Sequence, residues 1–166
     1  MVWSGLRVIE VVEKDETKVN ECVDLIRQLQ VKYNVNTENV IVDEDGVGGG
    51  VRDYLGCLGF INNSRPIQSK TNPQNFASLD QCYYHLAEYI NRNEVYVNCS
   101  DTVQKLLTQE LEWVRLPKEV DTSKIKLLGK DKIKEQIKRS PDYSDALMLR
   151  IFFTMYTPRP NYVKSF

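Results

Sequence analysis

A short apolar segment that ends in an acid and leads into a glycine-rich stretch constrains the fold of this chain most. Residues 39–43 read Asn-Val-Ile-Val-Asp, residues 44–50 contain four glycines, and residues 51–58 carry apolar side chains at helical spacing. A strand, a glycine-rich turn and a helix in this order form an α/β unit. Because open α/β sheets place their ligands at the carboxyl ends of strands, Asp43 is the first candidate functional residue.

The glycine-rich stretch has more than one interpretation. Gly48 and Gly49 would let a substrate backbone approach closely, and the N-terminus of the following helix would favour a phosphate. Alternatively, the glycines serve only the packing of a tight turn. A nucleotide-binding regulator is a weaker alternative, because the stretch lacks the lysine and the serine or threonine of a GxxxxGK[ST] loop.

The remaining segments are typical of a mixed α/β domain. Alternating apolar residues around Ser4-Gly5 predict a hairpin over residues 2–12, and a polar stretch up to residue 78 predicts a long loop. Further patterns predict helices over 17–33, 79–91 and 101–113, and Ser100 or Asp101 would cap the last of them. Strands are predicted near 60–62 and 95–97, and the tail over 157–166 is expected to be loose.

Composition sets broad limits on the function. With 166 residues, 42% of them apolar, the chain can form one domain with a substantial core, and a net charge of −1 offers no overall attraction for DNA. The four cysteines show no CxxC spacing, so we expect buried, reduced thiols. No apolar run resembles a signal peptide or a membrane span, which favours a soluble, cytoplasmic protein.

A second acidic motif follows Ser140-Pro141, a pair typical of a helix start. Asp142 and Asp145 are three residues apart and would share one face of that helix. Hard cations such as Mg²⁺ are bound through one or two carboxylates together with substrate phosphates. For Asp142 the simpler interpretation is a cap that satisfies the helix dipole, whereas for Asp145 we favour a metal ligand.

A basic stretch leads directly into this motif. Its seven cations face only Asp131 and Glu135, so it could hold a polyanion through phosphate contacts, although such a run is often just a solvated helix face. The basic residues are Lys124, Lys126, Lys130, Lys132, Lys134, Lys138 and Arg139.

The only histidine, His85, lies among tyrosines and leucine and is expected to pack or face solvent rather than act as a base.

Residues 42–55 and 130–147 together resemble the nuclease domain of phage terminase large subunits. In that family an Asp at the end of a strand precedes a glycine-rich turn, and a basic segment leads into a Ser-Pro-Asp…Asp-Ala-Leu helix. The resemblance implies a ribonuclease-H-like mixed central sheet flanked by helices, and metal-dependent endonucleolytic cutting during DNA packaging. Asp43 and Asp145 would be catalytic and would bind two Mg²⁺ or Mn²⁺ ions, with Asp142 as a further ligand. The implied DNA contacts are Lys130, Lys132, Lys134, Lys138, Arg139, Gly48 and Gly49.

The same resemblance implies partners and one departure from the family. The partners would be double-stranded DNA, the terminase ATPase domain, the small terminase subunit and the portal, in the cytoplasm of a bacterial host. The family's first catalytic Asp lies on a first strand, and this chain starts at Met1 just after it, so we expect an N-terminally truncated fold with weak or no nuclease activity in isolation. A non-catalytic prophage remnant that binds DNA or a protein, and another ribonuclease-H-like enzyme such as a junction resolvase, remain alternatives.

Overall fold

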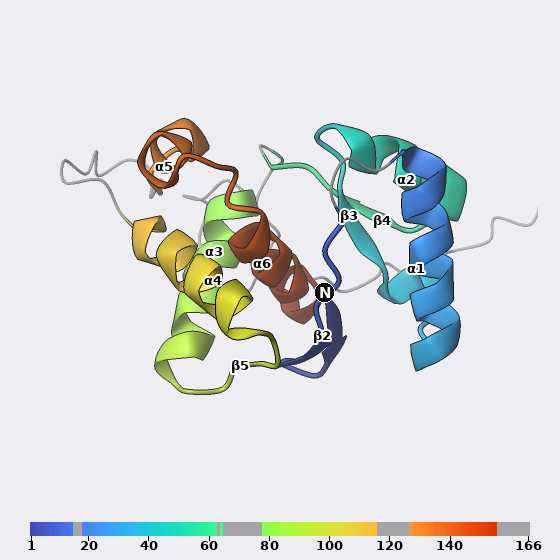
Figure 1. The fold of residues 1–166 in the computed structure, drawn as a ribbon, viewed down its shortest axis with the longest axis horizontal. Helices are drawn as coiled ribbons and strands as arrows, with labels where there is room; N and C mark the ends of the chain where they lie inside the picture. The colour runs from blue at the N-terminus through green and yellow to red at the C-terminus, as the bar shows by residue number, and fades with distance from the viewer. Residues whose placement is uncertain (15–17, 63, 65–77, 116–126, 156–166) are drawn as a thin grey trace, which may run out of the picture.

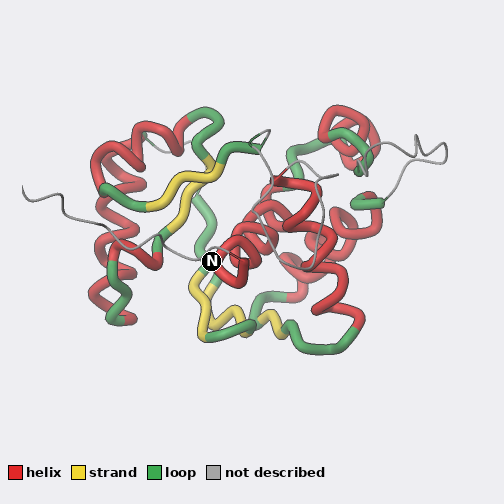
Figure 2. The backbone as a smooth tube through the Cα atoms, turned by 180° about the vertical axis from the view of Figure 1, so that it is seen from behind, coloured by secondary structure: helices red, strands yellow, loops and turns green. Residues whose placement is uncertain are grey.

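The computed structural model describes residues 1–14, 18–62, 64, 78–115 and 127–155. Figure 1 shows two groups of elements, with helices α3 (Ser78–Asn91), α4 (Asp101–Trp113), α5 (Lys130–Ile137) and α6 (Asp142–Met155) on one side. On the other side lie α1 (Val19–Tyr33), α2 (Val47–Leu55) and the strands β3 (Ile41–Asp43) and β4 (Leu58–Phe60). The view from behind in Figure 2 shows the same division.

The N-terminal hairpin is confirmed. Strands β1 (Val2–Ser4) and β2 (Arg7–Glu10) pair antiparallel, and Gly5 adopts a left-handed φ of 60° in the turn between them. Strand β5 (Tyr96–Val97) then pairs parallel with β2. A three-stranded mixed sheet results, in the order β1-β2-β5.

The predicted α/β unit is present, but its glycines lie elsewhere. Strands β3 and β4 pair parallel and are joined by α2, and a short 3₁₀ turn (Thr37–Asn39) precedes β3. Helix α2 begins at Val47 and ends at Leu55, so the expectation of a helix over 51–58 after a glycine turn was wrong in register. The following strand comes correspondingly earlier, at residues 58–60 rather than 60–62.

Close packing explains why glycine is needed inside this helix. A Cβ atom at Gly48 would lie 1.7 Å from the carbonyl oxygen of Asp43, and one at Gly50 would lie 3.1 Å from the side chain of Val19. The first contact brings the start of α2 directly against the end of β3, and the second brings α1 against α2. The helix geometry therefore uses these glycines for backbone approach within the protein.

Helix α6 occupies the centre of the helical group. It packs against α3, α4 and β3, and Phe152 meets Phe60 of β4 in an edge-to-face contact with centroids 5.8 Å apart. The bounds of α1, α3 and α4 agree with the sequence patterns, and Ser100 caps α4 by accepting from the Val103 amide, as predicted. The main core cluster joins both groups through Val8, Phe60, Cys82, Tyr83, Leu86, Leu107, Leu147, Met148 and Ile151.

Several other expectations can be compared with this fold. The described strands form two small sheets, β1-β2-β5 and β3-β4, rather than one continuous central sheet. All four cysteines are free thiols, of which Cys57 and Cys82 are buried and Cys22 and Cys99 are half-buried. Within the described part of the chain no helix is both long and apolar enough to cross a bilayer. The predicted long loop, the first lysines of the basic stretch and the tail 157–166 lie largely outside the described residues.

Candidate metal-binding site

The two acids selected from the sequence come together on a single cationic side chain. Asp43 ends β3, and Asp145 lies in the first turn of α6, 102 residues further along the chain by its number. The ammonium of Lys130 lies 2.7 Å from Oδ2 of Asp145 and 3.9 Å from Oδ2 of Asp43. Both carboxylates therefore reach the same point in space, from opposite groups of elements.

A buried tyrosine fixes Asp145 from the side of α3. The Tyr83 hydroxyl donates to Oδ1 of Asp145 at 2.6 Å and lies 3.1 Å from the Ser144 hydroxyl. Burial, followed by the negative charge of Asp145, raises the pKa of Tyr83 well above its usual 10.0. The neutral phenol is thus the stable form at ordinary pH, and it orients one carboxylate oxygen while Oδ2 remains directed to Lys130.

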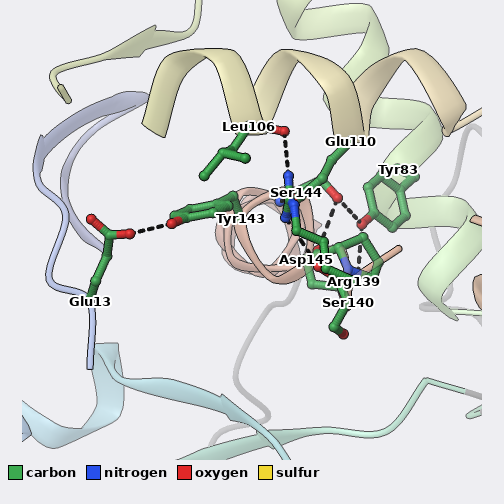
Figure 3. A network of polar contacts seen from close by, with 10 residues as sticks. Glu13, Tyr83, Leu106, Glu110, Arg139, Ser140, Tyr143, Ser144 and Asp145 are labelled. Atoms are coloured by element: carbon green, nitrogen blue, oxygen red, sulfur yellow. Dashed lines mark hydrogen bonds and ion pairs between the residues drawn. The ribbon is translucent and has the colours of Figure 1, made fainter. Parts of the chain in front are cut away.

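A second buried group holds the N-terminus of α6 (Figure 3). Glu110 of α4 is fully buried, and its Oε2 accepts from the Ser144 amide at 2.6 Å while Oε1 pairs with the Arg139 guanidinium. Arg139 also donates to the Leu106 carbonyl at 2.9 Å. Because α6 begins at Asp142, the Glu110 carboxylate accepts from an amide in the first turn of this helix and satisfies a donor that has no partner within the helix.

Burial and hydrogen bonding act in opposite directions on the pKa of the Glu110 carboxyl. Burial raises the pKa of the Glu110 carboxyl above its ordinary value, and the hydrogen bonds from Ser144 and Arg139 oppose that rise. A carboxylate in this position is stabilised only while both donors remain in place. The start of α6, and with it Asp145, is consequently tied to α4.

Asp43 is held more loosely. Its Oδ1 accepts from the backbone amide of Asp45 at 3.1 Å, and the Asn62 amide donates to the Asp45 carboxylate at 2.6 Å. Asp45 lies in the turn between β3 and α2. The Asp43 side chain is 34% exposed, against 14% for Asp145, so the acid on the strand is the more accessible to solvent.

The other predicted site residues lie on α2, α5 and α6 and in the short segment between α5 and α6. Lys132, Lys134 and Lys138 are exposed on and just after α5, whereas Arg139 is engaged by Glu110. Asp142 is exposed in the first turn of α6. The roles of these residues, of Gly48 and Gly49, and of Asp43 and Asp145 themselves stay predictions.

Two residues of the site were not selected from the sequence. Tyr83 is separated from Asp145 by 62 positions and Glu110 from Ser144 by 34, so no local pattern joins them. Their signal is weak: a tyrosine on the apolar face of one predicted helix, and an acid among the apolar positions of another. His85 pairs with Glu88 on its own helix, at 3.0 Å.

The donor set fits one hard divalent cation. Two carboxylates that converge on one positive charge, and remain partly exposed, leave room for water or phosphate oxygens as further ligands. Within the described residues no group of three acidic, histidine or cysteine side chains is positioned to share a metal ion. Asp43 and Asp145 could both contribute oxygen ligands to such an ion.

Comparison with solved structures relates this arrangement to a known fold. The nuclease domain of the large terminase subunit gp2 of bacterial virus Sf6 superposes with a TM-score of 0.73, covering 93% of this chain and 80% of that chain, at 20% sequence identity. This chain has the fold of a phage terminase nuclease domain. The ribonuclease-H-like fold class expected from the sequence is thereby confirmed. No protein-family model matches the sequence, and no curated protein matches it.

Proposed function

We propose that this chain is the metal-dependent endonuclease domain of a phage DNA-packaging terminase. The observation that carries the proposal is the convergence of Asp43 and Asp145 on one cation position, at the end of β3 and the start of α6, in a chain with a terminase nuclease fold. The acids come from opposite groups of elements, so their meeting is a property of the fold and not of local sequence.

Each residue would have a distinct part in this function. Asp43 and Asp145 would bind Mg²⁺ or Mn²⁺, and Tyr83 would keep Asp145 oriented through its 2.6 Å hydrogen bond. When bound, such an ion polarises a phosphodiester oxygen and stabilises the charge that develops during hydrolysis. The exposed lysines of α5 would hold double-stranded DNA through its phosphates.

Cutting by this chain alone is expected to be weak. A pair of catalytic metal ions needs about three acidic ligands, and within the described residues no three such side chains come together. A site with two acidic ligands would bind a divalent ion less tightly than a site with three. In a bacterial cytoplasm this domain would work together with the ATPase domain of the terminase, the small terminase subunit and the portal.

A plasmid-cleavage assay tests this function. Supercoiled DNA is incubated with the chain and Mn²⁺ or Mg²⁺, and Asp43→Asn and Asp145→Asn are compared with Asp53→Asn, which makes the same charge change at an exposed acid. We expect slow nicking that both site variants abolish and the control retains. Nicking that survives both site variants would contradict the site, and rapid wild-type cutting would contradict the expected weakness.

A non-catalytic DNA-binding protein is the second candidate. The exposed Lys132, Lys134 and Lys138 favour it, together with the presence of two converging acids instead of three. Under this alternative, duplex DNA would be retarded in a gel-shift assay without being cut in either metal. Removing one lysine should then weaken binding and reduce its salt dependence.

A further inference from the structure

We infer that Lys130 is a tethered competitor for the divalent cation, which occupies the ion's position between Asp43 and Asp145 and must leave before the ion binds. The inference deepens the proposed function and rests on it. It assigns to Lys130 a role in setting metal affinity that differs from the DNA contact predicted from its charge.

The geometry gives the reason for competition. An ammonium 2.7 Å from one Asp145 oxygen and 3.9 Å from the corresponding Asp43 oxygen fills the place where both carboxylates converge. A divalent ion needs carboxylate oxygens at about 2.0 to 2.6 Å, so it would lie close to the ammonium. Since two positive charges at that separation repel strongly in a partly buried site, one excludes the other.

The helix itself does not account for this placement. Lys130 is the first residue of α5, after the Gly129 cap, and a cation at a helix N-terminus is disfavoured by the helix dipole. The two carboxylates therefore hold the side chain where it is. Its ammonium is carried on a flexible four-carbon chain, and the side chain is 29% exposed, so the ammonium can swing into solvent while the backbone stays in place.

A neighbouring lysine provides a matched control. Lys132 lies on the same helix with an exposed side chain, so Lys132→Gln makes the same change in net charge away from the acids. Lys130→Arg keeps the positive charge at the site, and Lys130→Gln removes it. Thermal unfolding of each variant establishes that it is folded before metal is added.

Mn²⁺ binding to the full chain, followed by the electron paramagnetic resonance signal of free Mn²⁺ at constant ionic strength, tests the inference. Lys130→Gln should bind Mn²⁺ about tenfold more tightly than the wild type, since the tethered charge no longer competes. The Mn²⁺ affinities of Lys130→Arg and Lys132→Gln should stay within about threefold of the wild-type affinity. Asp145→Asn should lose the binding in every background.

The outcomes separate this inference from the proposed function. Equal Mn²⁺ affinity in wild type and Lys130→Gln, with binding still lost in Asp145→Asn, would overturn the competitor role and leave the metal site standing. Weaker binding by Lys130→Gln would overturn it as well, because the lysine would then assist the ion. Binding by none of the variants, or binding that survives Asp145→Asn, would overturn both.

Discussion

The two halves of the candidate site are built in different ways. Asp145 lies at the start of a helix whose first turn is fixed by the buried Glu110 and by the Tyr83 hydroxyl. Asp43 ends a three-residue strand of a two-stranded sheet, and its side chain is more than twice as exposed. One acid thus depends on buried polar contacts between distant elements, while the other depends on backbone packing beside it.

Among the substitutions that separate the two halves, removal of the buried Glu110 carboxylate should have the largest effect on stability. Glu110→Ala leaves the half-buried Arg139 guanidinium without its acid and the buried Ser144 amide without its acceptor. We expect a loss of about 3 kcal/mol in the free energy of unfolding, measured by urea denaturation.

Glu112→Ala is the control for that variant, because it removes the same side chain from an exposed position on α4. Its free energy of unfolding should change by about 0.5 kcal/mol or less. Equal effects of the two substitutions would mean that the Glu110 network contributes nothing particular to the position of α6.

Crowding the backbone beside Asp43 should have the next largest effect. In Gly48→Ala the new Cβ would lie 1.7 Å from the Asp43 carbonyl oxygen, so α2 or the end of β3 must move. We expect a destabilisation of about 2 kcal/mol together with weakened Mn²⁺ binding.

Gly49→Ala isolates the close approach from the general effect of alanine in a helix. Its Cβ would lie 3.3 Å from the Glu44 carbonyl oxygen, a contact that a small shift can relieve. Stability should remain within about 1 kcal/mol of the wild type, since alanine also favours helix. A Gly48→Ala protein that is as stable as Gly49→Ala would show that the approach of α2 to β3 is not tight.

Removing the Tyr83 hydroxyl should have the smallest effect at neutral pH. Tyr83→Phe loses the hydrogen bonds to Asp145 and Ser144, at a cost of about 1 kcal/mol in the free energy of unfolding. Because the folded protein raises the pKa of Tyr83 above 10.0, the stability linked to its protonated form is present below pH 10.0 and is lost as the pH rises toward the folded pKa.

The advantage of the wild type over Tyr83→Phe should therefore shrink as the pH rises above 10.0, which urea denaturation across this range would measure. Tyr54→Phe changes an exposed tyrosine of α2 and should leave the pH dependence of the wild type unchanged. A difference between wild type and Tyr83→Phe that stays constant with pH would contradict the shifted pKa.

Much of the fold could be predicted from local patterns. Apolar spacing placed α1, α3 and α4, and the apolar run before Asp43 placed β3 and the residue that ends it. The order of strand, glycine-rich stretch and helix predicts a turn at the glycines, yet contacts with Asp43 and Val19 require the small residue inside α2. Tertiary packing therefore decided where this helix begins.

The site was less predictable for the same reason. A carboxylate at the end of a strand or at the start of a helix can be recognised from the local sequence, so Asp43 and Asp145 could be predicted as candidate metal ligands. Charge alone placed Lys130 and Arg139 with the DNA-binding residues, but it did not indicate that each lies against a carboxylate of another element. Glu110 and Tyr83 act through contacts across the fold, which a single sequence does not reveal.

The shared cation site of Asp43 and Asp145 is tested most directly by a crystal structure of the chain soaked in Mn²⁺. Anomalous scattering from manganese locates the ion independently of the protein atoms. We expect one peak bonded to carboxylate oxygens of both Asp43 and Asp145, with the Lys130 ammonium displaced from its position between them. No peak there, or a peak bonded to neither acid while both side chains are ordered, would contradict the account.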